Sequence, residues 1–339
     1  MNPPQITIPP LPPNLYLHHT TLLPRPKLIL IGDSITEQGS LHANGWVTSL
    51  SIRYNRRLDV LNRGMNGYNS NWGKRALKLI LEDVCGSVNT IQSTTVDTTQ
   101  STATADTYSN KYPRCTFLIG YGANDSCLPT GSCHRHHVPI DDYSDNLRDM
   151  IQMIQSYHCQ DAAAATDETP TKTTSKVAIG LITPPPVDTS IQFSSRDNAI
   201  TKLYAEAVML IGQEMNVPVV DLWNGMQKPV RFGSRGDGAC IMAHDSLFDK
   251  DGNNSTDIFD RKHSNNDECT NTEYGIRWKQ EYLSDGLHLT PMGNYRMFEL
   301  VVEMLEKEMG LTVENVPRQY PDHSLVDAEF PDRSFVQGT

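Results

Sequence analysis

The sequence predicts an α/β protein, a three-layer α/β/α sandwich with a five-stranded parallel sheet. Two observations lead to this fold class. Short, continuous apolar runs alternate along the chain with longer stretches of helical periodicity, and Gly- and Asn-rich segments follow several of the runs. Continuous apolar runs are typical of strands buried on both faces, and strands that alternate with helices form parallel sheets. No such pattern encodes the order of the strands, and a flavodoxin-like order is our hypothesis.

The expected elements follow in chain order. Apolar runs predict strands at residues 28–31, 58–61, 115–119, 177–182 and 217–223. Apolar residues at helical spacing predict helices at residues 45–54, 72–84, 141–157, 196–216 and 294–309. Three prolines at 184–186 end the fourth run, because proline continues neither a helix nor a central strand.

The domain organisation follows from composition. A Pro-rich N-terminal arm (1–26) precedes a single domain (27–310) and a C-terminal tail without periodicity (311–339), which we expect to pack along the surface or fray. Segments dominated by small and polar residues cannot bury much surface and predict insertions near residues 86–110, 160–175 and 233–273.

Charge and composition exclude several functions. The net charge of −11 argues against nucleic acid and anionic membranes as partners. No apolar run approaches the roughly 18–20 residues of a membrane span, and the N-terminus lacks the charged region of a signal peptide. The seven cysteines are an odd number without a framework pattern, so we expect free thiols and a cytoplasmic protein. The oligomeric state is not readable from these features.

The most informative stretch is residues 27–39, KLILIGDSITEQG. Gly32 ends the first apolar run, and Asp33 and Ser34 follow at once. Ligands bind outside the carboxyl ends of parallel strands, so Ser34 is expected where chemistry would occur. The alternative is an ordinary strand-to-helix turn with Asp33 or Ser34 as the helix N-cap.

Residues after other strands suggest acyl transfer. Ser34 is a candidate nucleophile, and a serine hydroxyl needs an adjacent base. His288 is the natural base, because histidine titrates near neutral pH. Asp285, three residues earlier, could orient the imidazole. The N–H groups of Ser34 and Gly67 and the side-chain amide of Asn124 could stabilise an oxyanion.

Each of these residues also has a simple structural alternative. His288 alone could be a surface histidine, and Asp285 could merely belong to a turn. Asn124 could close a loop, and Gly67 could serve a turn that needs a positive φ angle. The joint pattern favours the catalytic interpretation.

Four motifs carry a family resemblance: GDSI at 32–35, Gly67, GAND at 122–125 and DGLH at 285–288. They resemble the four blocks of the SGNH (GDSL-type) hydrolases. The longer strings NRGMNGYNSNW, LITPPP and YLSDGLHLTPMGN look like the branch of isoamyl acetate-hydrolysing esterases.

The resemblance implies a Ser34–His288–Asp285 triad, with Asp33 in support. It also implies oxyanion donors at Ser34, Gly67 and Asn124. The expected activity is hydrolysis of small carboxylic esters with short acyl chains, through an acyl-enzyme. A thioesterase, a lysophospholipase and a carbohydrate deacetylase remain alternatives that would use the same site, and a non-catalytic ligand-binding relative is another. The expected partners are an ester substrate and water.

Two other patterns are not interpreted as metal sites. One loop is rich in metal-ligating side chains: Cys127, Cys133, His134, His136 and His137. Their spacing fits no usual Cys/His zinc pattern, so we predict no metal there. Residues 249–252, DKDG, do not have the glycine offset of an EF-hand. No Gly-rich nucleotide-binding loop follows any strand, so we expect no cofactor.

Overall fold

A computed structural model describes residues 25–85, 112–163, 177–192, 194–227, 274–316 and 318. The arm at 1–24, the predicted insertions at 86–110 and 233–273, residues 164–175 of the second predicted insertion and the tail after 318 lie outside the described residues.

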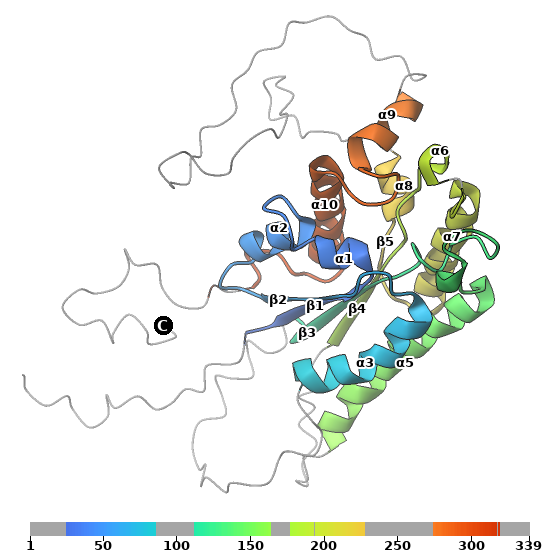
Figure 1. Cartoon of the computed structure of the whole chain (residues 1–339). Coiled ribbons are helices and arrows are strands. Elements are labelled where there is room, and N and C mark those ends of the chain that lie inside the picture. Colours follow the sequence, from blue (N-terminus) through green and yellow to red (C-terminus); the bar gives the residue numbers. More distant parts are fainter. Residues whose placement is uncertain are drawn as a thin grey trace, which may run out of the picture.

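The sheet has five strands: β1 (Lys27–Gly32), β2 (Asp59–Gly64), β3 (Cys115–Gly120), β4 (Val177–Ile182) and β5 (Val219–Val220). Their order is β2-β1-β3-β4-β5, and every neighbouring pair is parallel (Figure 1). This is the flavodoxin-like order, so both the predicted fold class and the strand order are confirmed.

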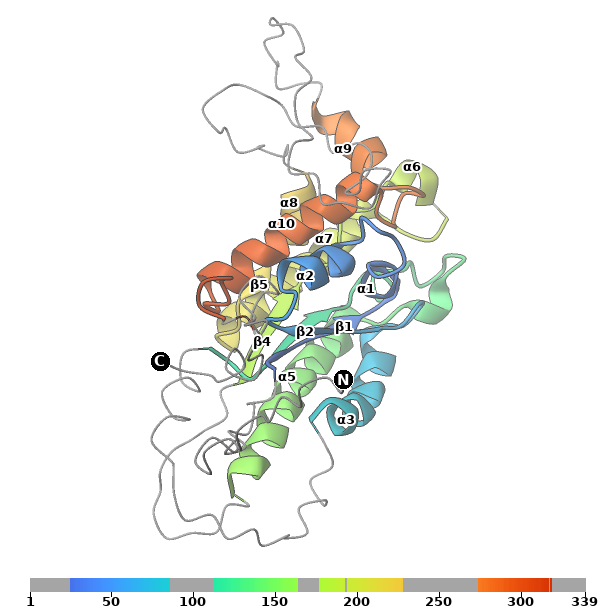
Figure 2. The same cartoon turned by 90° about the vertical axis from the view of Figure 1, so that its left-hand side faces the viewer.

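Helices cover both faces of the sheet (Figures 1 and 2). One layer contains α3 (Ser70–Cys85), α5 (Ile140–Ala163) and α7 (Asn198–Glu214). The other contains α2 (Trp46–Arg53), α8 (Leu222–Met226), α9 (Tyr274–Tyr282) and α10 (Pro291–Lys307). Three short helical segments lie in connections: α1 (Ser34–Gln38), η2 (His134–His136) and α6 (Thr189–Gln192).

The inner strand β1, which lies between β2 and β3, explains why the first apolar run is continuous. Leu28 and Leu30 point into the core that contains Trp46, whereas Ile29 and Ile31 point into the core on the opposite face. Successive side chains of a strand alternate between faces, so a strand covered on both sides needs apolar residues at every position.

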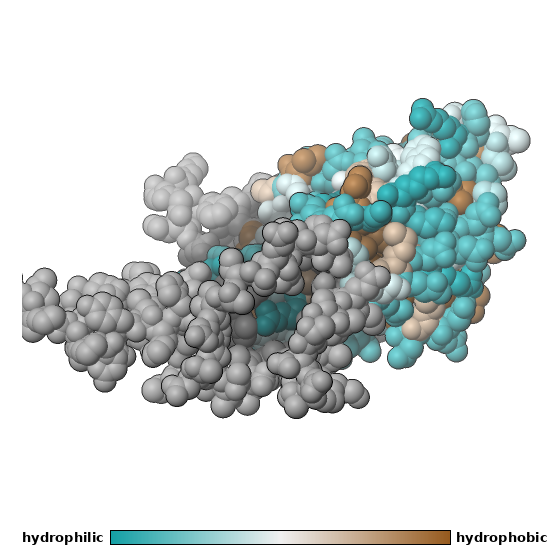
Figure 3. Space-filling model, turned by 90° about the horizontal axis from the view of Figure 1, so that it is seen from below, coloured by the Kyte–Doolittle hydropathy of each residue, from teal (hydrophilic) through white to brown (hydrophobic). Residues whose placement is uncertain are grey.

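The outer surface is polar where the helices meet solvent. Apart from the grey atoms, the face in Figure 3 is mainly hydrophilic, with small separated apolar patches. This is expected for helices whose apolar sides face the sheet. Among the described residues, none of the helices combines the length and apolarity that a membrane span requires.

Two strand predictions were wrong at their ends. The predicted strand 217–223 contains only Val219–Val220, because the Asp221 side chain accepts the Asn224 N–H and caps α8 at once. Strand β2 continues to Gly64, three residues beyond the predicted end at residue 61, because Gly64 pairs in register with Gly32 of β1.

The ends of two other segments also differ from the prediction. Helix α5 runs to Ala163, so residues 160–163 are helical and do not belong to a polar insertion. In the predicted C-terminal tail, Leu311 and Val316 are fully buried. The Tyr54 hydroxyl donates to the Leu311 carbonyl oxygen at 2.8 Å, so the tail begins as part of the core.

Candidate active site

Ser34 occupies the turn between β1 and α1. The Asp33 carboxylate accepts the Ile35 N–H at 3.0 Å and caps α1, and Ser34 is the first residue of that helix. A Cβ atom on Gly32 would lie 2.2 Å from Thr36 Oγ1 and 2.6 Å from the Gly120 carbonyl oxygen, so only glycine fits there. The structural alternative for Asp33 as an N-cap is therefore correct, and it leaves the Ser34 hydroxyl available.

The three predicted triad residues form one chain of hydrogen bonds. His288 Nε2 lies 3.0 Å from Ser34 Oγ, and His288 Nδ1 lies 2.7 Å from Asp285 Oδ2. This arrangement connects a hydroxyl to a ring nitrogen and the other ring nitrogen to a carboxylate. It has the geometry needed for a serine that transfers its proton to a base.

The turn that carries Asp285 and His288 is held largely by hydrogen bonds between its own residues. Asp285 Oδ1 accepts the N–H groups of Leu287 at 3.0 Å and of His288 at 2.8 Å. Gly286 has a φ of +85°, and the Gln192 side-chain amide donates to the Asp285 carbonyl oxygen at 2.8 Å. Partial burial raises the pKa of Asp285, but the hydrogen bonds from His288 and Leu287 outweigh it, so this pKa lies below its usual value.

The side-chain amide of Asn124 is held in one orientation. Its Nδ2 donates to the Tyr68 carbonyl oxygen at 2.8 Å, and its Oδ1 accepts from Arg196 Nη2 at 3.1 Å. The buried Arg196 also donates from Nε to the Ala123 carbonyl oxygen at 3.1 Å. Because an amide nitrogen has two hydrogens, one remains for a ligand after the bond to Tyr68.

The predicted oxyanion residues follow strands that end at the same edge. Gly32 pairs in register with Gly64 of β2 and with Gly120 of β3, so the segments that carry Ser34, Gly67 and Asn124 begin side by side. Gly67 has a φ of +75°, which glycine adopts at no steric cost.

Two buried carboxylates lie behind this edge. Burial raises the pKa of Asp33 to about 7 and that of Asp125 to about 6. Asp125 Oδ1 accepts the Ser70 N–H at 2.9 Å, which ties the β3 loop to the start of α3. The Arg196 guanidinium partly offsets the effect of burial on Asp33.

Sequence reasoning missed Arg196, Gln192 and Asp125 as parts of the site. Each acts on a residue far away in the chain, and no local spacing signals such a contact. It also predicted no metal in the Cys/His loop, whereas the structure gathers Cys127, Cys133 and His136 so that their ligand atoms lie within 4.8 Å of one another.

Comparisons with known proteins identify the family to which the chain is similar. The model of the GDSL-like Lipase/Acylhydrolase family matches residues 28–301. A GDSL esterase/lipase of Arabidopsis thaliana is 28% identical over 92% of this chain and 98% of its own length. The isoamyl acetate-hydrolyzing esterase 1 homolog of Rattus norvegicus is 29% identical over 92% of both chains. Among solved structures, a lipase/acylhydrolase of Enterococcus faecalis has a TM-score of 0.47 at 18% identity, covering 84% of this chain and 97% of that one.

Proposed function

The chain belongs to the GDSL-like lipase/acylhydrolase family and is a carboxylic ester hydrolase, and we propose that it is a serine esterase for small esters with short acyl chains. The observation that carries this proposal is the hydrogen-bonded chain from Ser34 Oγ through His288 to Asp285. A protein that only bound a ligand would have no need for a hydroxyl, an imidazole and a carboxylate in this order.

The proposed reaction has two halves. Ser34 Oγ attacks the ester carbonyl carbon while His288 Nε2 takes the hydroxyl proton, and Asp285 stabilises the imidazolium that forms. His288 then protonates the departing alcohol oxygen as the C–O bond breaks, which leaves Ser34 acylated. Water attacks the acyl-enzyme with His288 as the base. The His288 imidazolium then returns this proton to Ser34 Oγ as the acyl C–O bond breaks, so the serine hydroxyl is regenerated and the carboxylic acid leaves.

The oxyanion of each tetrahedral intermediate needs donors. We assign this role to the N–H groups of Ser34 and Gly67 and to Nδ2 of Asn124. Arg196 acts as a positioning residue, because its bond to Asn124 Oδ1 keeps the amide nitrogen of Asn124 on the side of Tyr68. The loss of one oxyanion donor typically costs about 10²–10³ in turnover.

The short acyl preference rests on the relatives. Relatives named isoamyl acetate-hydrolyzing esterase 1 homolog occur at 26–29% identity, and other relatives bear the broader name GDSL esterase/lipase. A thioesterase, a lysophospholipase and a carbohydrate deacetylase would need the same catalytic groups. Chain-length preference separates a short-chain esterase from a lysophospholipase. The cytoplasmic location stays a prediction from the sequence.

The decisive experiment is hydrolysis of p-nitrophenyl esters from acetate to palmitate by wild type and by Ser34→Ala. We expect the highest kcat/KM on acetate or butyrate, and a loss of about 10⁴-fold or more in the variant. Ser51→Ala is the control, because Ser51 is an exposed serine of α2 whose hydroxyl donates within its own helix, to the Val47 carbonyl oxygen.

Three results would change the proposal. A maximum at long acyl chains would retain Ser34 as the nucleophile but make lipids the substrate. Full activity of Ser34→Ala would exclude Ser34 as the nucleophile. An inactive wild type that also resists labelling by an organophosphonate would refute the serine mechanism, because labelling needs only an activated serine.

A further inference from the structure

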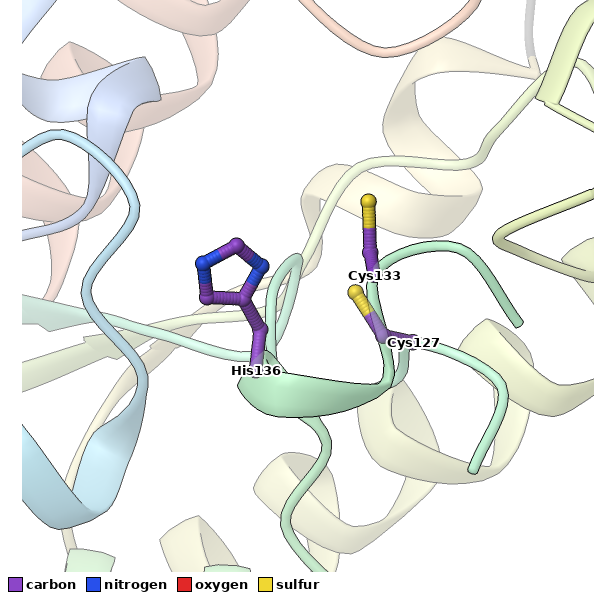
Figure 4. Close-up of side chains that lie close together, drawn as sticks. All are labelled: Cys127, Cys133 and His136. Carbon is purple, nitrogen blue, oxygen red and sulfur yellow. The ribbon is translucent and has the colours of Figure 1, made fainter. Parts of the chain in front are cut away.

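The loop between β3 and α5 gathers three potential metal ligands outside the Ser34–His288–Asp285 chain. These are Cys127 Sγ, Cys133 Sγ and one ring nitrogen of His136, all within 4.8 Å of one another (Figure 4). Cys127 is fully buried, and Cys133 and His136 are half-buried. The proposed esterase reaction uses none of them.

The backbone explains how the three side chains meet. Cys133 is the N-cap of the 3₁₀ segment η2 and His136 is its last residue, with the His136 N–H donating to the Cys133 carbonyl oxygen at 2.9 Å. Side chains three residues apart eclipse one another in a 3₁₀ turn, so both project from the same side. Cys127 reaches them because the His137 ring bonds to the Cys127 carbonyl oxygen at 2.7 Å and closes the loop.

His136 contains a buried polar atom that lacks a partner. Within the described part of the chain, its Nδ1 has no hydrogen bond. The other ring nitrogen, Nε2, faces the Gly67 turn, 3.8 Å from the position that a Cβ on Gly67 would occupy. Figure 4 shows one ring nitrogen on the side of the two sulfur atoms, which is therefore Nδ1. A buried unpaired nitrogen in a native fold requires an explanation, and a bound ion supplies one.

We propose that Cys127 Sγ, Cys133 Sγ and His136 Nδ1 bind one soft divalent cation of the Zn²⁺ type, with water as the fourth ligand. Two sulfurs and one imidazole nitrogen form a donor set that suits zinc. In a tetrahedral zinc site, ligand atoms lie about 3.5–3.8 Å apart. The three atoms must therefore approach one another only slightly from their present separations.

The charge balance also favours this cation. Binding releases both thiol protons to solvent, and the two resulting thiolates cancel the charge of the ion. The buried guanidinium of Arg196, whose residue forms a backbone bridge with Cys127, then faces a neutral centre instead of an added cation.

The cation would stabilise the loop beside the proposed oxyanion donors. The Asn69 side-chain amide donates to the His136 carbonyl oxygen at 3.0 Å, and the Cys127 N–H donates to the Asn124 carbonyl oxygen at 3.1 Å. The expected role is structural, because none of the three ligands belongs to the Ser34–His288–Asp285 chain. Metal binding can therefore be tested whether or not the protein hydrolyses esters.

The test is titration of the reduced, chelator-stripped full-length protein with Co²⁺ in the absence of oxygen. We expect one Co²⁺ per chain, with the thiolate-to-cobalt charge-transfer band and the intense visible bands of a tetrahedral site. Addition of Zn²⁺ should abolish the charge-transfer band and the visible bands, because Zn²⁺ displaces Co²⁺ from the site. A wild-type protein without a thiolate band would overturn the proposal.

Variants of the proposed ligands test whether the cation binds at this loop. Cys133→Ser and His136→Gln should each weaken Co²⁺ binding by about 100-fold or more, because each removes one ligand. Cys115→Ser and His134→Gln are the matched controls: Cys115 lies in β3, and His134 is exposed on η2 with its Nδ1 3.1 Å from the Gly131 carbonyl oxygen. If both ligand variants bind Co²⁺ as tightly as these controls, the ion is held elsewhere and the assignment is wrong.

Discussion

Ser34 and His288 are hydrogen-bonded to each other, yet the segments that carry them are held in different ways. Ser34 is 3% exposed, at the end of the inner strand β1, between two hydrophobic cores. The Asp285 side chain is 53% exposed, in a turn between α9 and α10. The nucleophile is thus positioned by the whole sheet. The acid–base pair is positioned mainly by hydrogen bonds within four residues, together with bonds from the Asp188 N–H to the Gly286 carbonyl oxygen and from the Gln192 side chain to the Asp285 carbonyl oxygen.

This difference predicts how each region responds to mutation. Changes near Ser34 should reduce the free energy of unfolding and the activity together, because the same packing supports both. Changes to the Asp285 and His288 side chains, which are more exposed than Ser34, should reduce activity with a smaller effect on global stability, whereas Leu287 of the same turn packs in the core. The following predictions test this contrast, beginning with the largest expected effect.

Asp285→Asn should lower kcat by about 10⁴-fold. The Asn oxygen can still accept the Leu287 and His288 N–H groups, so its NH₂ group faces His288 Nδ1 and favours the tautomer that cannot take the proton of Ser34. We expect the free energy of unfolding to change by less than about 1 kcal/mol. Asp221→Asn, at the N-cap of α8, is the control. Wild-type kcat in Asp285→Asn would remove Asp285 from the proposed triad.

Gly32→Ala should destabilise the protein by about 3 kcal/mol, because the new Cβ would overlap Thr36 Oγ1 and the Gly120 carbonyl oxygen. Gly286→Ala should cost less, about 1–2 kcal/mol, from the strain of a positive φ in an alanine, because its tightest new contact, Ile191 Cβ at 3.0 Å, requires only a small shift of that side chain. Urea unfolding measures both values. Equal losses would contradict the contrast between the two regions.

Asp33→Asn should change the pH dependence of stability. Burial raises the pKa of Asp33 to about 7, so the folded protein binds this proton more tightly than the unfolded chain does. Wild-type stability should therefore decrease as pH rises from about 4 to about 7. Asparagine keeps an oxygen for the Ile35 N–H without a charge, so the variant should gain about 2 kcal/mol relative to wild type at pH 8 and nothing at pH 4.

The pKa of Asp285 is shifted in the opposite direction to that of Asp33, so Asp285 serves as the comparison. Its folded-state pKa lies below the usual value, so its stabilising contribution is present above the unfolded pKa and is lost as pH falls through the folded pKa. Chemical denaturation at several pH values measures both effects. If the stability of Asp33→Asn followed the wild-type curve at every pH, Asp33 would be charged in the fold.

Gln192→Ala should have the smallest effect, a decrease of about 2–5-fold in kcat/KM, because it removes one exposed hydrogen bond to the Asp285 carbonyl oxygen. Gln152→Ala, at an exposed position of α5, is the matched control. A loss as large as that of Asp285→Asn would show that the turn depends on α6 and is not locally organised.

The sequence alone determined which segments form strands, which form helices, and where the candidate catalytic residues lie along the chain. A strand covered on both faces must be continuously apolar, which made β1, β3 and β4 readable to within one residue at each end. Three candidate site residues come shortly after predicted strands: Ser34, Gly67 and Asn124. Parallel strands place the segments after their carboxyl ends at the same edge of the sheet. Short segments have too little periodicity to be recognised, so the sequence did not predict α1, α6 or α9. For the same reason, the predicted fifth strand was too long and included the first residues of α8, the helix that Asp221 caps.

Only the tertiary structure decided which distant side chains meet. The amide of Asn124 is oriented by Arg196, 72 positions along the chain, and the turn at Asp285 is held by Gln192, 93 positions away. The Cys127–Cys133–His136 cluster has no recognisable spacing, because a 3₁₀ turn and a loop closure bring its members together. Periodicity is a local property that a sequence displays directly, whereas these contacts arise only after the cores on both faces of the sheet have set the positions of the loops.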